Sequence, residues 1–212
     1  MLSRLNLKLI YFIIPFLYFF KLILYPDIID LGGDQVSYWK ILANDFTCES
    51  FEYCWRELRW TMILWTKAVS FLFGKTILSY YLSSTIPIFF AFILFTIIFY
   101  RHISFIGYLF FATLWLINPL IVSHSVNIGI VSLNLFLVSF LLVFIDTIKN
   151  HNKENYFVFI LSIIFFALYG VIILNLILLP FILIYLYKDF KISYFFKFVF
   201  LFILFLLIET LI

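Results

Sequence analysis

The chain has 212 residues, of which 66% are hydrophobic, 24% are aromatic and 12% are charged, with a formal net charge of +3. The mean hydropathy is +1.18, and a soluble domain carries about twice this charged fraction, so the composition excludes an ordinary water-soluble enzyme. The alternation of polar and apolar residues that marks a membrane β-barrel is not visible. We therefore predict an all-α, polytopic helical membrane protein with about seven spans, forming a single membrane domain over residues 1–212. The basic excess indicates orientation in a membrane and no nucleic-acid partner.

The first apolar run, residues 10–25, follows Arg4 and Lys8. No small-residue cleavage site appears before the polar segment that comes next, which is typical of a retained signal anchor. Because basic flanks stay on the cytoplasmic side, we predict a cytoplasmic N-terminus and place the following loop outside the cytoplasm.

That loop, residues 26–59, gathers most of the acidic residues of the chain. Seven acids and three bases give it a charge of −4, and they are Asp27, Asp30, Asp34, Asp45, Glu49, Glu52, Glu57, Lys40, Arg56 and Arg59. The rest of the chain is almost unbroken apolar sequence. A membrane protein with this distribution is expected to place its chemistry in the loop.

The run Trp60–Phe73 is too short to be an ordinary span. Its 14 residues, at about 1.5 Å each, cover about two-thirds of a ~30 Å hydrocarbon core. Polar residues including Lys67 are interspersed with apolar ones, which favours a helix on the outer interface. If it crossed the membrane, the later basic flanks would all face outward against the positive-inside rule. Residues 26–73 are therefore predicted to form one extracytoplasmic loop with an interfacial helix.

The remaining spans are predicted at residues 77–100, 103–122, 128–145 and 194–212, with two short crossings before Lys188. These two crossings are expected to break near residues 170–175, with Pro180 inside the second, and a re-entrant pair is the alternative.

Within the polar loop, Asp34 and Tyr38 lie four residues apart and would share one face of a helix over residues 35–42. A carboxylate just outside the membrane can accept a proton from an acceptor hydroxyl, or it can hold a divalent cation that neutralises a phosphate leaving group. The spacing alone leaves open a plain helix-capping role for Asp34.

Three runs in order carry a family resemblance: GGDQVSYWKILAND, then WRELRWTMILWTKAVSFLFGKTILSYYLSSTI, then LWLINPLIVSHS. Over roughly residues 5 to 190 they resemble the N-terminal part of the C-type (GT-C) membrane glycosyltransferases, in particular bacterial relatives of protein O-mannosyltransferases and aminoarabinose transferases. The resemblance implies an enzyme that transfers a sugar from a polyprenyl-phosphate-linked donor to an envelope lipid, glycan or protein acceptor. It also implies a multi-pass protein of the bacterial inner (plasma) membrane, in contact with membrane lipids.

The same resemblance suggests roles for individual residues. Asp34 matches the first family acid, taken as the catalytic base or acceptor-orienting residue, and Tyr38 matches the tyrosine after it. Gln35 stands where the family has a second acid, which weakens a metal-binding pair, so no cofactor is assigned and a divalent cation stays open. Arg56 and Arg59 fall near a basic position that could hold the donor phosphate, although both could equally be interface anchors.

In the second outer turn the family carries an acid, and this chain has Ser123, His124, Ser125 and Asn127 instead. His124 could contact phosphate or shuttle a proton, and a hydrogen-bonded histidine at a helix end is the alternative. In the polar loop, Cys48 and Cys54 could form a disulfide or stay free.

Relatives are more than twice as long, which predicts a truncated or split gene product that works with a downstream membrane subunit. Two other functions stay open. One is an envelope polysaccharide polymerase or ligase, and the other is an inactive or non-enzymatic membrane remnant.

Overall fold

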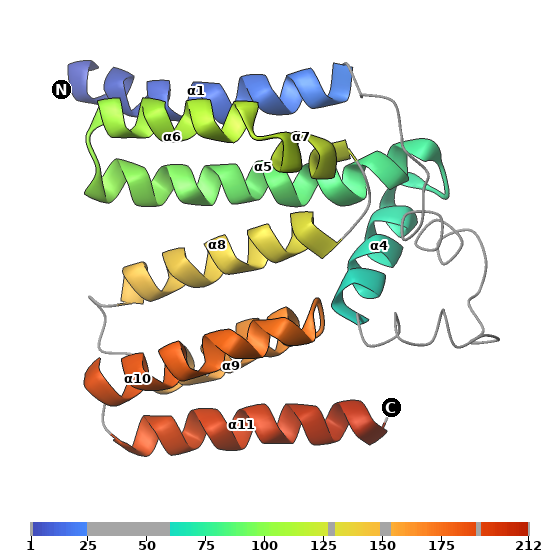
Figure 1. The fold of residues 1–212 in the computed structure, drawn as a ribbon, viewed down its shortest axis with the longest axis vertical. Coiled ribbons are helices and arrows are strands. Elements are labelled where there is room, and N and C mark those ends of the chain that lie inside the picture. Colours follow the sequence, from blue (N-terminus) through green and yellow to red (C-terminus); the bar gives the residue numbers. More distant parts are fainter. Residues whose placement is uncertain (1, 25–59, 127–129, 149–153, 190–191, 212) are drawn as a thin grey trace.

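The computed structural model describes residues 2–24, 60–126, 130–148, 154–189 and 192–211. Every regular element in these residues is a helix. The long helices lie side by side in a row and alternate in direction along the chain (Figure 1). The predicted all-α class is thus confirmed for the described part of the chain.

The N-terminal half of the row contains α1 (Leu2–Leu24), α5 (Ile77–His102) and α6 (Phe105–Ile117). The first helix is longer than the apolar run that predicts it. Aromatic side chains fill the contact between the three helices: Phe92 of α5 stacks on Trp115 of α6 with ring centroids 5.1 Å apart. Such pairs add to the free energy of burial, so the aromatic-rich composition serves packing here.

The segment predicted as one span over residues 103–122 is divided by Asn118. α6 ends at Ile117, and a separate helix α7 (Pro119–Val126) follows. A residue before proline is disfavoured in the helical region, and Asn118 has φ −68° and ψ 114°. Its side-chain oxygen accepts the Leu120 amide at 3.0 Å, which caps α7. The predicted span over residues 103–122 therefore consists of two helices in the structure.

The C-terminal half contains α8 (Ile130–Ile148), α9 (Glu154–Tyr169), α10 (Leu179–Asp189) and α11 (Ile192–Leu211). Buried residues of all four helices form one apolar core, with members including Leu141, Phe157, Leu161, Phe165, Leu186, Phe198 and Phe202. α8 also packs along α5. This contact joins the two halves of the row.

The predicted break near residues 170–175 is confirmed. α9 ends at Tyr169, and the chain reverses through residues 170–172 into a short 3₁₀ helix, η1 (Ile173–Leu178). Pro180 is the second residue of α10. Proline lacks an amide hydrogen, but in the first turn of a helix an amide has no acceptor within the helix. The proline therefore does not interrupt α10.

The helix predicted over Trp60–Phe73 forms with these bounds and is α4. It lies across the end of the row instead of along it (Figure 1). Gly74 ends it with a φ of 77°, a conformation that glycine adopts without steric cost. Thr76 then starts α5, because its side chain accepts the Ser79 amide. Two capping residues therefore set the angle between α4 and α5.

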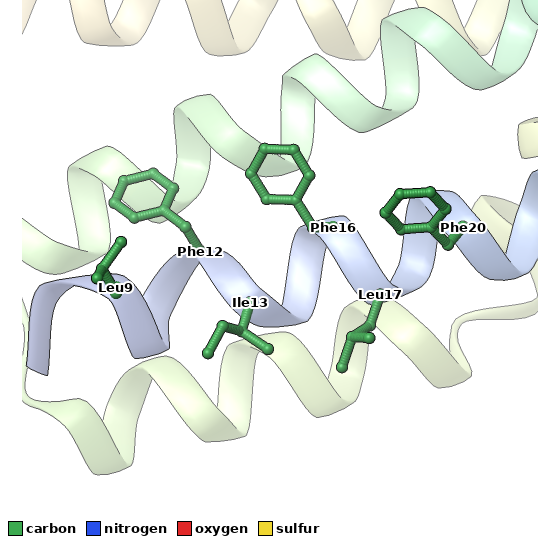
Figure 2. A pocket seen from close by; sticks show the side chains of 6 residues that line it. All are labelled: Leu9, Phe12, Ile13, Phe16, Leu17 and Phe20. Atoms are coloured by element: carbon green, nitrogen blue, oxygen red, sulfur yellow. The ribbon is translucent and has the colours of Figure 1, made fainter. Parts of the chain in front are cut away.

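Two helical segments are long and apolar enough to cross a membrane by length and composition, Ile77–His102 and Ile130–Thr147. The other apolar helices are shorter. The outward face of α1 is an example of the apolar surface of these helices. Figure 2 shows Phe12 and Phe16 pointing toward one neighbouring helix, and Ile13 and Leu17 toward the other. Together with Leu9 and Phe20 they line an open apolar groove of about 310 Å³.

Candidate functional site at the loop-bearing end

The polar loop is attached at one end of the helix row. Leu24, the last residue of α1, and Trp60, the first residue of α4, bracket it, and both lie at this end (Figure 1). We call this the loop-bearing end; it also includes α4, the first turns of α5, α7, the start of α8 and residues 170–178.

Most of the predicted site residues fall in the loop itself. Asp34, Tyr38, Arg56 and Arg59 lie outside the described residues, as do Cys48 and Cys54. Their mutual arrangement therefore stays a prediction.

His124 is the predicted site residue that the structure describes. It lies on α7 at the loop-bearing end and is half-buried. Burial lowers the pKa of its imidazole below the ordinary value, because the charged form loses hydration. The ring is therefore neutral at pH 7 and can accept a proton or a hydrogen bond.

α4 is tied to two other helices at this end. The Thr61 amide donates to the Gly170 carbonyl at 3.2 Å, and the Thr61 hydroxyl donates to the Ala167 carbonyl at 2.9 Å. On the next turn the indole nitrogen of Trp65 donates to the Ser83 carbonyl at 2.8 Å. These bonds fix the helix that follows the polar loop against α9 and α5.

Gly170 makes this contact possible. A Cβ atom at this position would overlap the Trp60 ring and the Thr61 hydroxyl. The absence of a side chain lets α4 approach the end of α9 closely enough to form the two Thr61 bonds. The position is therefore sensitive to the addition of a single methyl group.

Two asparagines form a buried polar link nearby. The side-chain nitrogen of Asn175 donates to Asn134 Oδ1 at 3.0 Å and to the Leu168 carbonyl at 2.6 Å. Asn175 is only 8% exposed, so these bonds satisfy an amide that would otherwise be costly to bury. Sequence reasoning did not assign either residue a role. The signal that could have found them is an amide inside an otherwise apolar run.

The described charges at this end are positive. Lys21, Lys67 and Lys75 are exposed and make no ion pair or hydrogen bond with the described residues. No aspartate or glutamate is among the described side chains here. Nor do three His, Cys, Asp or Glu side chains gather as metal ligands anywhere in the described residues.

The opposite end carries a different polar cluster. We call it the basic end, because α5 finishes there with Arg101 and His102. Asp146 of α8 joins both residues, with its Oδ2 2.7 Å from Arg101 Nη1 and its Oδ1 2.8 Å from His102 Nε2. Arg101 and His102 form one of the later basic flanks that the sequence analysis used for orientation only. Asp146, an acid that comes shortly before Lys149 at the end of an apolar run, could have suggested the pairing.

The loop-bearing end thus offers a neutral imidazole and lysine ammonium groups at the end of the row where the polar loop is attached. Such groups can bind phosphate and hydroxyl oxygens. No protein-family model, curated protein or solved structure matches this chain.

Proposed function

We propose that the chain is a multi-pass protein of the bacterial inner membrane, with about seven spans and a cytoplasmic N-terminus. Support comes from the outward faces of its helices, where large apolar side chains are exposed on every long helix, among them Leu17, Phe110, Phe181 and Phe200. Soluble monomers rarely expose contiguous apolar patches of such extent. Lipid would cover these faces.

The distribution of charge supports the proposed orientation. Arg101, His102 and Lys188 lie where helices end at the basic end, which is also where the N-terminus lies (Figure 1). The polar loop with its net charge of −4 is attached at the other end. Basic residues at helix ends on the side of the N-terminus are what the positive-inside rule expects of a cytoplasmic face.

Cysteine labelling tests this orientation. In a Cys48→Ser, Cys54→Ser background, single cysteines replace Ser50, His102 or His151. A membrane-impermeant maleimide added to intact cells should modify the cysteine at position 50 and leave positions 102 and 151 unmodified until the membrane is opened. Modification of position 102 from outside would mean that α4 crosses the membrane, and the proposed membrane topology would be wrong.

We infer that the protein acts as a glycosyltransferase of the C-type class, moving a sugar from a polyprenyl-phosphate-linked donor to an envelope acceptor. The observation that carries the proposal is the concentration of seven of the eleven acids of the chain in residues 26–59. The lipid-linked donor and the membrane-facing acceptor would meet at the membrane surface where this loop is attached. The motif order around Asp34 and its resemblance to the family add support.

The proposed roles follow the chemistry of each group. Asp34 accepts the proton of the acceptor hydroxyl as the sugar is transferred. Arg56 or Arg59 neutralises the phosphate that leaves, since a guanidinium group binds phosphate in two places. Tyr38 orients the substrate beside Asp34. His124, neutral at pH 7, contributes a hydrogen bond to the donor.

Replacement of Asp34 by Asn tests the catalytic role. Turnover should fall by about 10²–10⁴-fold, the range of a lost general base, while expression and insertion stay as in the wild type. Asp45→Asn is the matched control, because it removes a carboxylate of the same loop outside the family pattern. Transfer is assayed in membranes from a polyprenyl-phosphate sugar, with the proposed downstream membrane subunit present.

Other outcomes identify the alternatives. Asn caps a helix about as well as Asp, so equal activity of Asp34→Asn and wild type would remove the catalytic assignment and favour a non-enzymatic role. Growth of a polymer in place of single sugar transfer would favour the polymerase or ligase function.

A further inference from the structure

A second groove lies between the last turn of α1 and the first turns of α5, with a volume of about 200 Å³. Its lining is Leu22, Ile23, Ile77, Leu78, Tyr81, Leu82 and Thr85. Leu22 and Leu82 are buried at its floor, whereas Ile77 is 60% exposed at its mouth. An apolar floor with an open apolar mouth suits a hydrocarbon chain that enters from the side.

A basic residue lies close in sequence to the mouth of this groove. Lys75 lies two residues before Ile77, is exposed and has no partner among the described residues. The larger groove on the outward face of α1 differs, because its lining is entirely apolar (Figure 2). Any lipid chain can cover that shallow face, whereas the α1–α5 groove has buried leucines at its floor and Lys75 close in sequence to its mouth.

The place of this groove is also informative. Ile23 lies one residue before the end of α1, so the groove opens next to the point where the polar loop leaves the helix row. A lipid lying in it would hold its polar end at the height of that loop. An ammonium group at the same height complements a phosphate.

We propose that the α1–α5 groove binds the polyprenyl chain of the donor lipid near its phosphate, and that Lys75 contacts the phosphate. The inference rests on the proposed function for the identity of the lipid. It adds a binding site on α1 and α5 to the residues of the polar loop, and it assigns Lys75 and Leu78 roles in donor affinity.

Equilibrium binding of a long-chain polyprenyl monophosphate to the purified full chain in detergent tests the site. Lys75→Gln should weaken binding about tenfold, the usual effect of losing a hydrogen bond to a charged group. Leu78→Trp should weaken it by filling the groove. The matched controls, Lys188→Gln at the basic end and Leu64→Trp on α4, should bind as the wild type does. Wild-type affinity in both groove variants, with helix content unchanged, would overturn the proposal.

Two other lipids identify the occupant. The corresponding polyprenol, which lacks the phosphate, should bind more weakly than the monophosphate and should be insensitive to Lys75→Gln. Phosphatidylglycerol should bind weakly and show no response to Leu78→Trp. Equal binding of polyprenol would overturn the phosphate contact, and equal groove-dependent binding of phosphatidylglycerol would mean a general anionic-lipid site instead.

These measurements separate the groove from the proposed reaction, because binding needs no transfer. Suppose that Asp34→Asn transfers as well as wild type while the groove variants lose the monophosphate. This result would reject the proposed reaction and support the proposed lipid-binding groove. If Asp34→Asn abolishes transfer while the groove variants keep full affinity, the site fails and the reaction stands.

Discussion

The two ends of the helix row are held together by different interactions. At the loop-bearing end, α4 meets α9 through close packing at Gly170 and through hydrogen bonds that the Thr61 amide and hydroxyl donate to backbone carbonyls. At the basic end, α5 and α8 meet through the charges of Arg101 and Asp146, whose side chains are 39% and 23% exposed. The contact between α4 and α9 depends on close packing, whereas the contact between α5 and α8 is electrostatic and partly exposed to solvent.

This difference has consequences for function. Buried contacts tolerate little change in volume, because protein interiors are close-packed. Exposed ion pairs contribute little and weaken with salt. The contact between α4 and α9 is therefore more sensitive to a change in side-chain volume than the ion pair at the basic end is.

Gly170→Ala should show the largest effect. The added methyl group overlaps the Trp60 ring and the Thr61 hydroxyl, so we expect a loss of about 1–3 kcal/mol in the free energy of unfolding, typical of overpacking. Reversible unfolding in mixed micelles measures it. Ala68→Val, an exposed change of α4, is the control. A stability equal to wild type would show that α4 moves freely away from α9.

Asn175→Leu should destabilise the same end by about 1–2 kcal/mol, because the buried Leu168 carbonyl and Asn134 lose a partner. The double variant with Asn134→Leu should lose less than the sum of the two single variants, since the asparagines share one bond. Unfolding of all four proteins in the same micelles completes the cycle. Additive losses would mean that the two amides act independently.

Asp146→Asn should cost less, at most about 1 kcal/mol, because the pairs with Arg101 and His102 are partly exposed. The difference from wild type should shrink as salt is added. A loss as large as that of Gly170→Ala would show that this ion pair contributes as much as the contact between α4 and α9, and it would remove the contrast between them.

His124→Gln should have the smallest effect, visible only as a change with pH. Burial holds the folded-state pKa of His124 below its ordinary value, so the unfolded state binds the proton more readily. Its contribution to stability is therefore present above the unfolded pKa of about 6.5 and is lost as the pH falls below it. Melting temperatures at about pH 8 and about pH 5 should differ less in His124→Gln than in wild type. An unchanged difference would contradict the burial.

Local sequence signals predicted several elements well. Hydropathy and length gave the helical class, and the bounds of α4 agree with the structure. The break after α9 was indicated by Gly170 within the apolar run. The division between α6 and α7 was missed, although Pro119 marks it, because hydropathy continues across Asn118 and outweighed the backbone preference of a residue before proline.

The candidate site was less predictable. The polar loop was evident from its charges, and His124 from its place in a short polar turn. The groove between α1 and α5 was not predicted, since its walls are ordinary apolar residues of two helices. Composition carries no sign of which apolar residues enclose a cavity and which pack tightly.

The sequence by itself determined that the chain is helical, where most helices begin and end, and where its charges gather. These properties depend on neighbours within a few turns, through hydropathy, caps, glycine and proline. Only the tertiary structure decided that Thr61 bonds to Ala167, 106 residues away, and that Arg101 reaches Asp146, 45 residues away. Such pairs form when whole helices pack, and packing depends on shape complementarity between distant side chains, which no local pattern records.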